Sequence, residues 1–245
     1  MATDDFREQE DSYRTPSISV FFPCFNEQDN IEKLVENALK ALKSASSDFE
    51  ILIINDGSSD ETGDRADALA KSDSQIRVIH HETNLGYGAA LQSGFREAQK
   101  DLIFYTDGDG QFDIAEMPPL LDLIHDCDIV SCYRLNRQDP MIRKINGWCW
   151  TRLVCLVFGL RMRDIDCAFK LYRREVFTDM PLRSTGALID TEVMARATRK
   201  GCRIKQKGVQ HYPRTAGTQT GANLRVVLRA FVELFHLRKR ILKGD

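Results

Sequence analysis

The stretch DLIFYTDGDGQFD, residues 101–113, joins an apolar run to three carboxylates that are separated mainly by glycines. Its first half is typical of a buried β-strand, because a short apolar run bounded by polar residues suits a strand covered on both faces. Asp107, Asp109 and Asp113 follow where that strand ends. The stretch therefore predicts an α/β sheet whose edge carries negative charge.

Four similar apolar runs occur nearby, separated by segments long enough for helices. We expect strands at 17–24, 49–55, 76–80, 101–106 and 128–132, with helices at 28–44, 60–72, 87–100 and 114–125. This alternation predicts a mostly parallel central sheet flanked by helices on both faces. Further on we expect a helix near 147–159, an irregular stretch, a helix at about 188–200, a strand at 202–210 and a helix at about 222–240.

The predicted organisation is one domain with two short additions. Residues 1–15 are acidic and polar, which excludes a secretory signal and predicts a flexible tail. Residues 16–221 form the domain, and residues 222–245 form an amphipathic helix that packs on it or lies at a membrane surface. The longest apolar stretch, residues 145–160, contains Arg152 and is too short to cross a bilayer, so we expect no transmembrane helix.

Composition excludes several classes of protein. The 245 residues are 42% hydrophobic and 29% charged, which suits a globular protein with a sizeable core. A formal net charge of −2 gives no basic field, so we expect no nucleic-acid partner. The seven cysteines include no CxxC pair and are odd in number, which favours reduced thiols in the cytoplasm. The sequence indicates no oligomeric state.

Ligands of open α/β sheets bind beyond the carboxyl ends of the strands, so those ends are the expected site. They read PCFNE (23–27), NDGSSDET (55–62), HHETNLGYG (80–88), DGDGQFD (107–113) and CYRLNR (132–137). Four of the five present acids, amides or glycines, and the last presents arginines.

The acids Asp107 and Asp109 stand two residues apart in a glycine-rich turn. Such a pair can hold a hard divalent cation that takes its other ligands from water and phosphate. Asp-Gly pairs are, however, also common in turns that bind nothing. On the first reading, Asp109 binds Mg²⁺ or Mn²⁺ and the cation binds a diphosphate. In the neighbouring motif, Asp56 can accept from the N–H groups of a base, while Ser58–Asp60 can cap a helix.

Gly86-x-Gly88 precedes a predicted helix but is not a complete dinucleotide fingerprint. Leu91 occupies the third glycine position, and the motif follows the third strand rather than the first. A Rossmann oxidoreductase is therefore disfavoured, while the glycines still allow the backbone to approach phosphate or sugar.

Together, PCFNE, NDGSSDET, NLGYGAAL and DGDGQ resemble the motifs of family 2 glycosyltransferases, and within them of the polyprenyl-phosphate (dolichol-phosphate) sugar synthases. GLRMRDIDCAFKLYRREVF, residues 159–177, is similar to a later segment of the same family. The resemblance covers roughly residues 17–240 and implies a single nucleotide-diphospho-sugar transferase domain of the GT-A type. Asn55 stands where the family usually has the first Asp of D-D-G-S.

The resemblance also implies an activity. An inverting, metal-dependent hexosyltransferase would move a sugar from a nucleotide-sugar donor to a polyprenyl or dolichyl phosphate, using Mg²⁺ or Mn²⁺. It would sit in the cytoplasm with peripheral contact to the cytoplasmic membrane face. GDP-mannose, UDP-glucose and UDP-N-acetylhexosamine all remain open as donors.

The candidate site residues, which the resemblance implies in part and the charged residues indicate in part, fall into four groups. Those around the nucleotide sugar are Pro23, Asn26, Glu27, Asp56, Gly86, Asp107 and Gly108. Those that hold the metal are Asp109 and Gln111. Those with a catalytic role are Asp109, Arg134, Asp164 and Asp166. Those that bind the acceptor phosphate are Arg134, Arg143, Lys170, His211 and Arg214.

Charge supports a phosphate acceptor, because residues 134–174 hold ten Lys and Arg against three Asp. The metal and the arginines would stabilise the leaving nucleoside diphosphate. An anionic acceptor needs no general base, whereas a hydroxyl acceptor needs a carboxylate, for which the candidates are Asp164, Asp166 and Asp190.

Three alternatives stay open at this stage. The first is the same transfer to a soluble hydroxyl acceptor in glycan or secondary-metabolite synthesis. The second is a phosphohydrolase with Asp107 as nucleophile, because an apolar strand followed by DxD also begins that motif. The third is a non-catalytic nucleotide-sugar-binding subunit.

Overall fold

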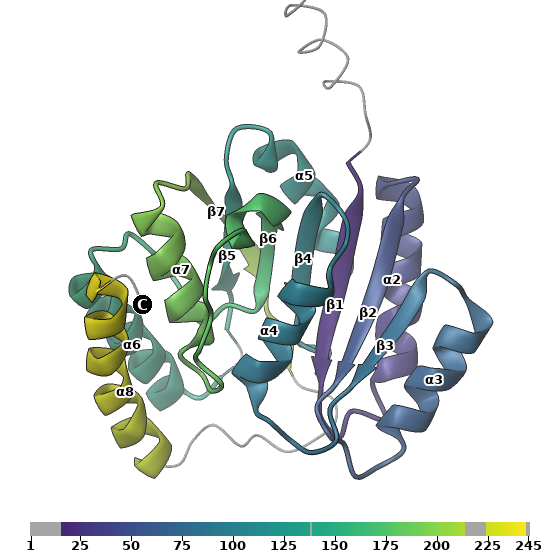
Figure 1. Cartoon of the computed structure of the whole chain (residues 1–245), viewed down its shortest axis with the longest axis horizontal. Coiled ribbons are helices and arrows are strands. Elements are labelled where there is room, and N and C mark those ends of the chain that lie inside the picture. The colour runs from purple at the N-terminus through teal and green to yellow at the C-terminus, as the bar shows by residue number, and fades with distance from the viewer. Residues whose placement is uncertain (1–15, 138, 214–223, 244–245) are drawn as a thin grey trace, which may run out of the picture.

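The computed structural model describes residues 16–137, 139–213 and 224–243, with only the backbone for 224–230 (Figure 1). The predicted tail at 1–15 and Arg214 lie outside these residues. The elements are β1 (Ile18–Cys24), α2 (Ile31–Ala45), β2 (Phe49–Asn55), α3 (Thr62–Ser72), β3 (Ile76–His80), α4 (Tyr87–Glu97), β4 (Leu102–Thr106), η2 (Ile114–Glu116), α5 (Pro118–Ile124), β5 (Ile129–Leu135), α6 (Met141–Phe158), β6 (Phe169–Arg173), η3 (Arg174–Phe177), α7 (Ile189–Arg199), β7 (Ile204–Gln210) and α8 (Leu224–Lys243).

Seven strands form one sheet in the order β3-β2-β1-β4-β6-β5-β7. Neighbouring strands are parallel except at β6, which is antiparallel to both β4 and β5. The predicted α/β fold with a mostly parallel sheet is thereby confirmed. The parallel strands end at one edge, the lower edge in Figure 1.

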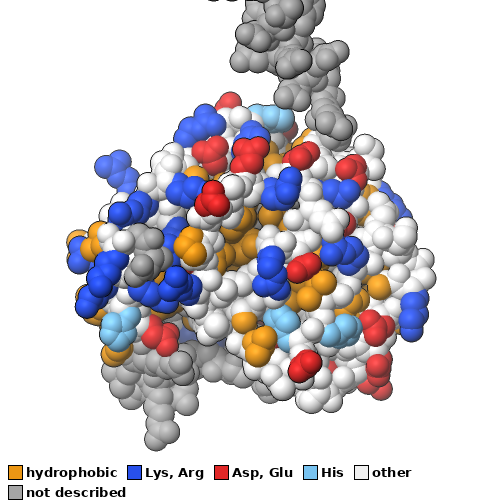
Figure 2. Space-filling model, in the orientation of Figure 1, with side chains coloured by type: hydrophobic (Ala, Val, Ile, Leu, Met, Phe, Trp, Pro, Cys, Tyr) orange, Lys and Arg blue, Asp and Glu red, His pale blue; other side chains and the backbone are white. Residues whose placement is uncertain are grey.

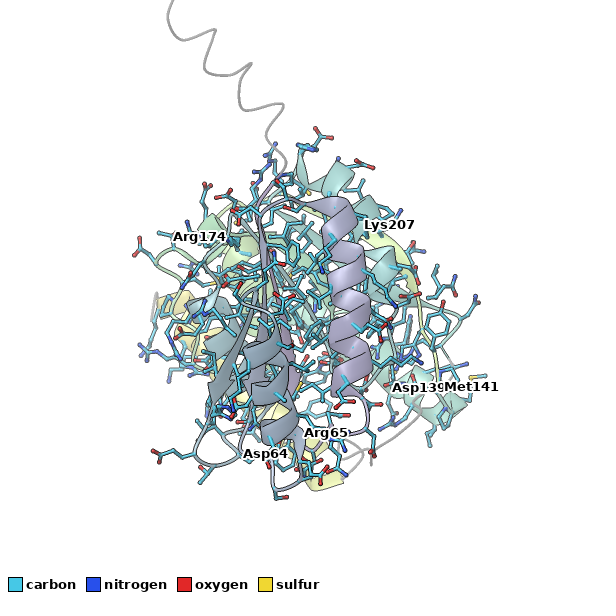
Figure 3. The ribbon with its side chains drawn as sticks, turned by 90° about the vertical axis from the view of Figure 1, so that its right-hand side faces the viewer. Asp64, Arg65, Asp139, Met141, Arg174 and Lys207 are labelled. Carbon is cyan, nitrogen blue, oxygen red and sulfur yellow. The ribbon has the colours of Figure 1, made fainter. Side chains whose placement is uncertain are left out.

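Apolar side chains cover both faces of the sheet, which explains why the strand sequences are continuously apolar. In β1, Val20 and Phe22 join the cluster beneath α2, α3 and α5, whereas Phe21 joins the cluster beneath α4, α6, α7 and α8. Figure 3 shows α2 lying along its side of the sheet. Helix α8 buries Leu234, Leu237 and Ile241 in the second cluster, while the boundary at residue 221 stays a prediction.

Two expectations about secondary structure were wrong. Helix α6 begins at Met141, directly after Pro140 and about two turns earlier than predicted. The stretch that we expected to be irregular contains β6. The sequence pattern did not indicate this strand, because Lys170 interrupts an otherwise apolar run. Of the helices in the described part of the chain, none combines the length and the apolar character that crossing a membrane requires.

Lys170 lies at the centre of the sheet with 0% of its surface exposed. Its ammonium donates to the Asp190 carboxylate of α7, to the Tyr105 hydroxyl of β4 at 3.2 Å and to the Ile165 carbonyl at 3.1 Å. Tyr105 in turn donates its hydroxyl hydrogen to Asp190. These contacts satisfy a charge that would otherwise be very unfavourable in the core.

Replacing Lys170 with methionine should strongly destabilise the fold, because the Asp190 carboxylate would stay buried without its cation. We expect Lys170→Met to lower the free energy of unfolding by about 3–5 kcal/mol, measured by urea denaturation. Lys40→Met is the matched control, because Lys40 pairs with Glu36 on the exposed face of α2 and should be nearly neutral. Equal effects of the two substitutions would contradict the assignment of Lys170 to the core.

Candidate functional site

A cavity of about 530 Å³ opens beyond the carboxyl ends of β1 and β2. Gly108 lies directly against the wall residues Pro23 and Cys24. A Cβ atom added to Gly108 would lie 3.1 Å from Cys24 Sγ and 3.2 Å from the Pro23 carbonyl oxygen. Asp107 adjoins it through Tyr87, whose hydroxyl donates to Asp107 at 2.9 Å. The predicted donor residues in its wall are Pro23, Asn26, Glu27, Asp56 and Gly86. Five of the seven predicted donor residues thus line this cavity, and the other two, Asp107 and Gly108, lie next to residues of its wall.

Hydrogen bonds between the first two strand-end loops fix the shape of this cavity. Asn26 has φ of +55°, a left-handed conformation that asparagine tolerates better than most residues. Its backbone N–H donates to Ser58 Oγ at 3.0 Å, and its side-chain oxygen accepts from the Ser59 N–H at 2.9 Å. The Glu27 N–H donates to Thr62 Oγ1 at 2.8 Å. The cavity wall is therefore ordered by the protein itself.

Asp56 anchors a third loop against the same cavity. Its carboxylate, 3% exposed, accepts from the Leu85 and Gly86 N–H groups at 2.9 Å each and lies 2.6 Å from His81 Nδ1. A carboxylate has about four acceptor positions, so these three partners leave capacity for one more donor.

The carboxylates of Asp107 and Asp109 lie close together at the end of β4. Burial, and next the charge of Asp109, raise the pKa of Asp107 to about 8. Asp109 accepts from the Gln111 N–H at 3.1 Å. A divalent cation would relieve this repulsion. Within the described ranges, no group of three or more His, Cys, Asp or Glu is arranged to hold a metal ion.

His211 follows β7 and lies beside this acidic loop. Its ring packs on Phe112 at 5.5 Å, and the Gln111 carbonyl accepts from the Tyr212 N–H at 2.9 Å. The Gln111 side chain donates to the Tyr212 carbonyl at 3.3 Å, which ties the two segments together. His211 is 5% exposed, and its Nδ1 has no hydrogen-bond partner among the residues that the structure places.

The environment of His211 favours its neutral form. Burial, and next the charge of Arg134, lower the pKa of the imidazole. A neutral ring with an unpartnered buried nitrogen suits a divalent cation bound beside Asp109. The contact with the acceptor phosphate that the sequence suggested for His211 stays a prediction, since a neutral imidazole still donates from one ring nitrogen.

A second cavity, of about 330 Å³, lies beyond β5 and is basic. Arg134 pairs with Asp164 through two hydrogen bonds of 2.7 Å, and the Arg163 guanidinium lies 4.1 Å from the centre of the Tyr133 ring. The charged residues in its wall are Arg134, Arg137, Lys144, Arg152, Arg163 and Asp164. Five cations face one carboxylate, so this basic pocket fits an anion.

Among the predicted phosphate-binding residues that the structure describes, Lys170 is corrected, while Arg134, Arg143 and His211 stay predictions. Arg134 lines the basic pocket, but Arg143 lies outside its wall and approaches Asp139 at 3.4 Å. Lys170 cannot meet a phosphate, because its charge is held in the core by Asp190. The residues that the sequence reasoning missed are Arg137, Lys144, Arg152 and Arg163. A predicted helix that began at residue 141, instead of near residue 147, would have contained both Lys144 and Arg152, two turns apart.

The three candidate bases have different environments. Arg134 keeps the pKa of Asp164 low despite burial. Asp190 is 4% exposed and bound to Lys170 and Tyr105. Burial, followed by the charges of Asp190 and Asp164, raises the pKa of Asp166 to about 7. A carboxylate with the pKa of Asp166 can act as a base near neutrality.

Gly88, in the first turn of α4, serves packing. A Cβ atom on Gly88 would lie 2.3 Å from the Ser184 carbonyl oxygen, and the Gly88 N–H donates to the Thr185 carbonyl at 2.9 Å. The fully buried Glu192 of α7 accepts from the Arg183 and Ser184 N–H groups at 3.0 and 2.7 Å. Glu192 thereby holds residues 183–186 against α4, a contact that no local sequence pattern indicates.

Comparison with known proteins gives a consistent result. The sequence pattern of the family described as glycosyl transferase family 2 matches residues 19–180. A dodecaprenyl-phosphate galacturonate synthase of Rhizobium johnstonii is 27% identical over 97% of this chain and 72% of its own length. An undecaprenyl-phosphate 4-deoxy-4-formamido-L-arabinose transferase of Salmonella choleraesuis is 32% identical over 86% of this chain, which spans only 64% of that protein. Glycosyltransferase AglD of Haloferax volcanii is 31% identical over 80% of this chain, which spans 33% of it.

Solved structures share the fold. Glucosyl-3-phosphoglycerate synthase of Mycobacterium tuberculosis, in complex with Mn²⁺, UDP and glucosyl-3-phosphoglycerate, superposes with a TM-score of 0.69. The match covers 91% of this chain and 80% of that one at 20% identity, so it shows the GT-A type of fold alone. The same synthase has also been crystallised with Mg²⁺ and UDP.

A side chain at Gly88 should displace residues 184–186 and distort the wall of the larger cavity. We expect Gly88→Ala to lower the free energy of unfolding by about 1–3 kcal/mol, because the added methyl group overlaps backbone atoms. Gly186→Ala is the matched control, since a Cβ atom there meets nothing within 4 Å. Urea denaturation measures both, and a neutral Gly88→Ala would contradict the tight packing.

The raised pKa of Asp166 predicts a pH-dependent effect on stability. The folded protein keeps a proton that the unfolded chain has already lost, so this contribution to stability is present at low pH and disappears as pH rises to about 7. Asp166→Asn should therefore raise the melting temperature at about pH 8, with a smaller gain at about pH 5. Asp64→Asn, an exposed change on α3, is the control (Figure 3). A gain independent of pH would contradict the assignment.

Proposed function

The chain belongs to glycosyl transferase family 2, and on this premise we propose that it transfers a sugar from a nucleotide diphospho-sugar to a polyprenyl phosphate. The observation that carries the proposal is the placement of the two cavities on one edge of the sheet. The larger has the acidic loop beside it, and the smaller is basic. The names of the Rhizobium and Salmonella relatives, which state polyprenyl-phosphate acceptors, support this proposal.

The larger cavity is the proposed donor site. Asp56 has one acceptor position left for an N–H group of the base, and Asn26 and Glu27 line the same wall. Asp107 and Tyr87 lie where the ribose or diphosphate would follow. The donor base and sugar are left to experiment.

Asp109 and the neutral His211 are the proposed protein ligands of the cation, with Gln111 beside them. A bound Mg²⁺ or Mn²⁺ would neutralise the donor diphosphate and stabilise the charge that develops on the leaving group. The buried, unpartnered Nδ1 of His211 supports this assignment.

The basic pocket is the proposed site for the acceptor phosphate. Arg163 and Lys144 would contact it, while the pair of Arg134 with Asp164 keeps that guanidinium in place. A phosphate oxygen would attack the anomeric carbon as the bond from that carbon to the diphosphate oxygen breaks, which inverts the configuration. No base is needed, because the phosphate is already an anion at neutral pH.

A polyprenyl tail resides in a bilayer, so the proposal includes peripheral contact with the cytoplasmic face of a membrane. The second candidate, transfer to a soluble hydroxyl acceptor, is favoured by one observation, the pKa of about 7 at Asp166. In that case Asp166 would take the proton from the attacking hydroxyl.

Release of nucleoside diphosphate from a panel of GDP- and UDP-sugars, with Mg²⁺ or Mn²⁺ in detergent, tests both candidates. We expect release to require added polyprenyl phosphate, to follow one donor and to fall at least about 100-fold in Asp109→Ala. Asp29→Ala, in the exposed turn before α2, should leave the rate unchanged. Arg163→Gln should raise KM for the lipid more than KM for the donor.

Other outcomes separate the candidates. Release that is indifferent to the lipid and is lost in Asp166→Asn would favour a hydroxyl acceptor and contradict the proposed lipid transferase. Full activity in Asp109→Ala would contradict the proposed cation site.

A further inference from the structure

Helix α6 exposes an unusual amount of apolar surface. Leu156 is 82% exposed, Ile142 70%, Met141 68%, Trp148 58% and Ile145 53%. Single exposed apolar residues are ordinary on protein surfaces, whereas a group of this size on one helix marks an interaction surface.

The spacing of these residues places them on one side of the helix. Met141, Ile145 and Trp148 are separated by four and three residues, and the same row continues through the exposed Arg152 to Leu156. Figure 3 labels Met141 at the outer margin of the molecule, beside Asp139. We call the apolar residues of this row, together with Ile142, the α6 apolar face.

The α6 apolar face adjoins the basic pocket. Lys144, Trp148 and Arg152 line that pocket, and Trp148 belongs to both surfaces. The helix carries three basic residues, Arg143, Lys144 and Arg152, and no acid. Figure 2 shows further basic side chains gathered on the side of the molecule where α8 lies.

These features match one kind of partner better than any other. A protein partner would need an apolar surface of its own, with acids placed to meet the flanking cations. A bilayer with anionic headgroups supplies an apolar layer and a negatively charged layer at once. Apolar side chains enter the acyl boundary, Lys and Arg reach the headgroups, and Trp lies between them.

We propose that the α6 apolar face docks on the surface of an anionic phospholipid bilayer. Docking through Ile142 and Ile145 would place the mouth of the basic pocket at the level of the headgroups. The docking itself does not require the transferase activity, whereas its use in presenting a lipid phosphate to the pocket rests on the proposed function.

Flotation of the full chain with vesicles, without any acceptor lipid, tests the docking. We expect binding to phosphatidylcholine vesicles that contain phosphatidylglycerol, and much weaker binding to phosphatidylcholine alone. The double variant Ile142→Ser with Ile145→Ser should weaken binding by a factor on the order of ten or more. The double variant Val232→Ser with Phe235→Ser is matched in exposure but lies on α8, and it should bind like the unchanged protein.

Tryptophan fluorescence locates the contact. The chain has two tryptophans, and Trp150 packs on Phe231 with ring centres 5.7 Å apart. In Trp150→Phe, the remaining Trp148 should shift its emission to shorter wavelength when anionic vesicles are added. An unchanged emission maximum, or equal loss of binding in the α6 and α8 variants, would overturn the proposal.

Two further measurements distinguish membrane docking from dimer formation and from the proposed transfer activity. If a second copy covers the α6 apolar face, light scattering will show a dimer that Ile142→Ser with Ile145→Ser dissociates, without vesicle binding, and the proposal fails. If transfer exists, the same variant should keep its activity on acceptor in detergent and lose it on acceptor in vesicles. Vesicle binding without any transfer would refute the proposed function and leave the docking intact.

Discussion

The buried contact between Lys170 and Asp190 holds together the elements on which the site depends. Lys170 belongs to β6, its hydrogen-bond partner Tyr105 to β4, and Asp190 to the first turn of α7. The acidic loop follows β4, the segment with Asp164 and Asp166 precedes β6, and residues 183–186 precede α7. A buried ion pair contributes little net stability compared with apolar packing, but it permits few alternative arrangements of its partners. The pair therefore specifies how three site segments meet.

The strands and their polar ends could be predicted because both depend on local sequence. Apolar runs such as residues 49–55 are recognisable without knowledge of their neighbours, and parallel strands bring their carboxyl ends to one edge whatever their order. Strand β6 could not be predicted in this way, since Lys170 is compatible with a core only if Asp190 meets it there. The basic pocket and the neutral state of His211 likewise depend on packing between distant segments.

In the proposed reaction, the two cavities would divide the electrostatic demands of a transfer between anions. Acids beside the larger cavity create a need for a cation, while the smaller cavity presents positive charge directly. Arg134 and Asp164 stand at the basic pocket and neutralise each other in part, and His211 between the two regions stays uncharged. Under the proposed function, the phosphate groups of a donor and an acceptor could thus approach closely without strong repulsion, because each would meet its own source of positive charge.

The contact between Gly88 and residues 184–186 crosses a boundary in the sequence. The pattern shared with the family ends at residue 180, yet the segment that fills the space left by the missing Cβ atom of Gly88 lies just beyond it. The part of the fold that the family pattern covers and the part beyond it are therefore not independent modules. A residue larger than glycine at position 88 would require a different backbone path in the segment after residue 180, so neither part can be altered here without the other.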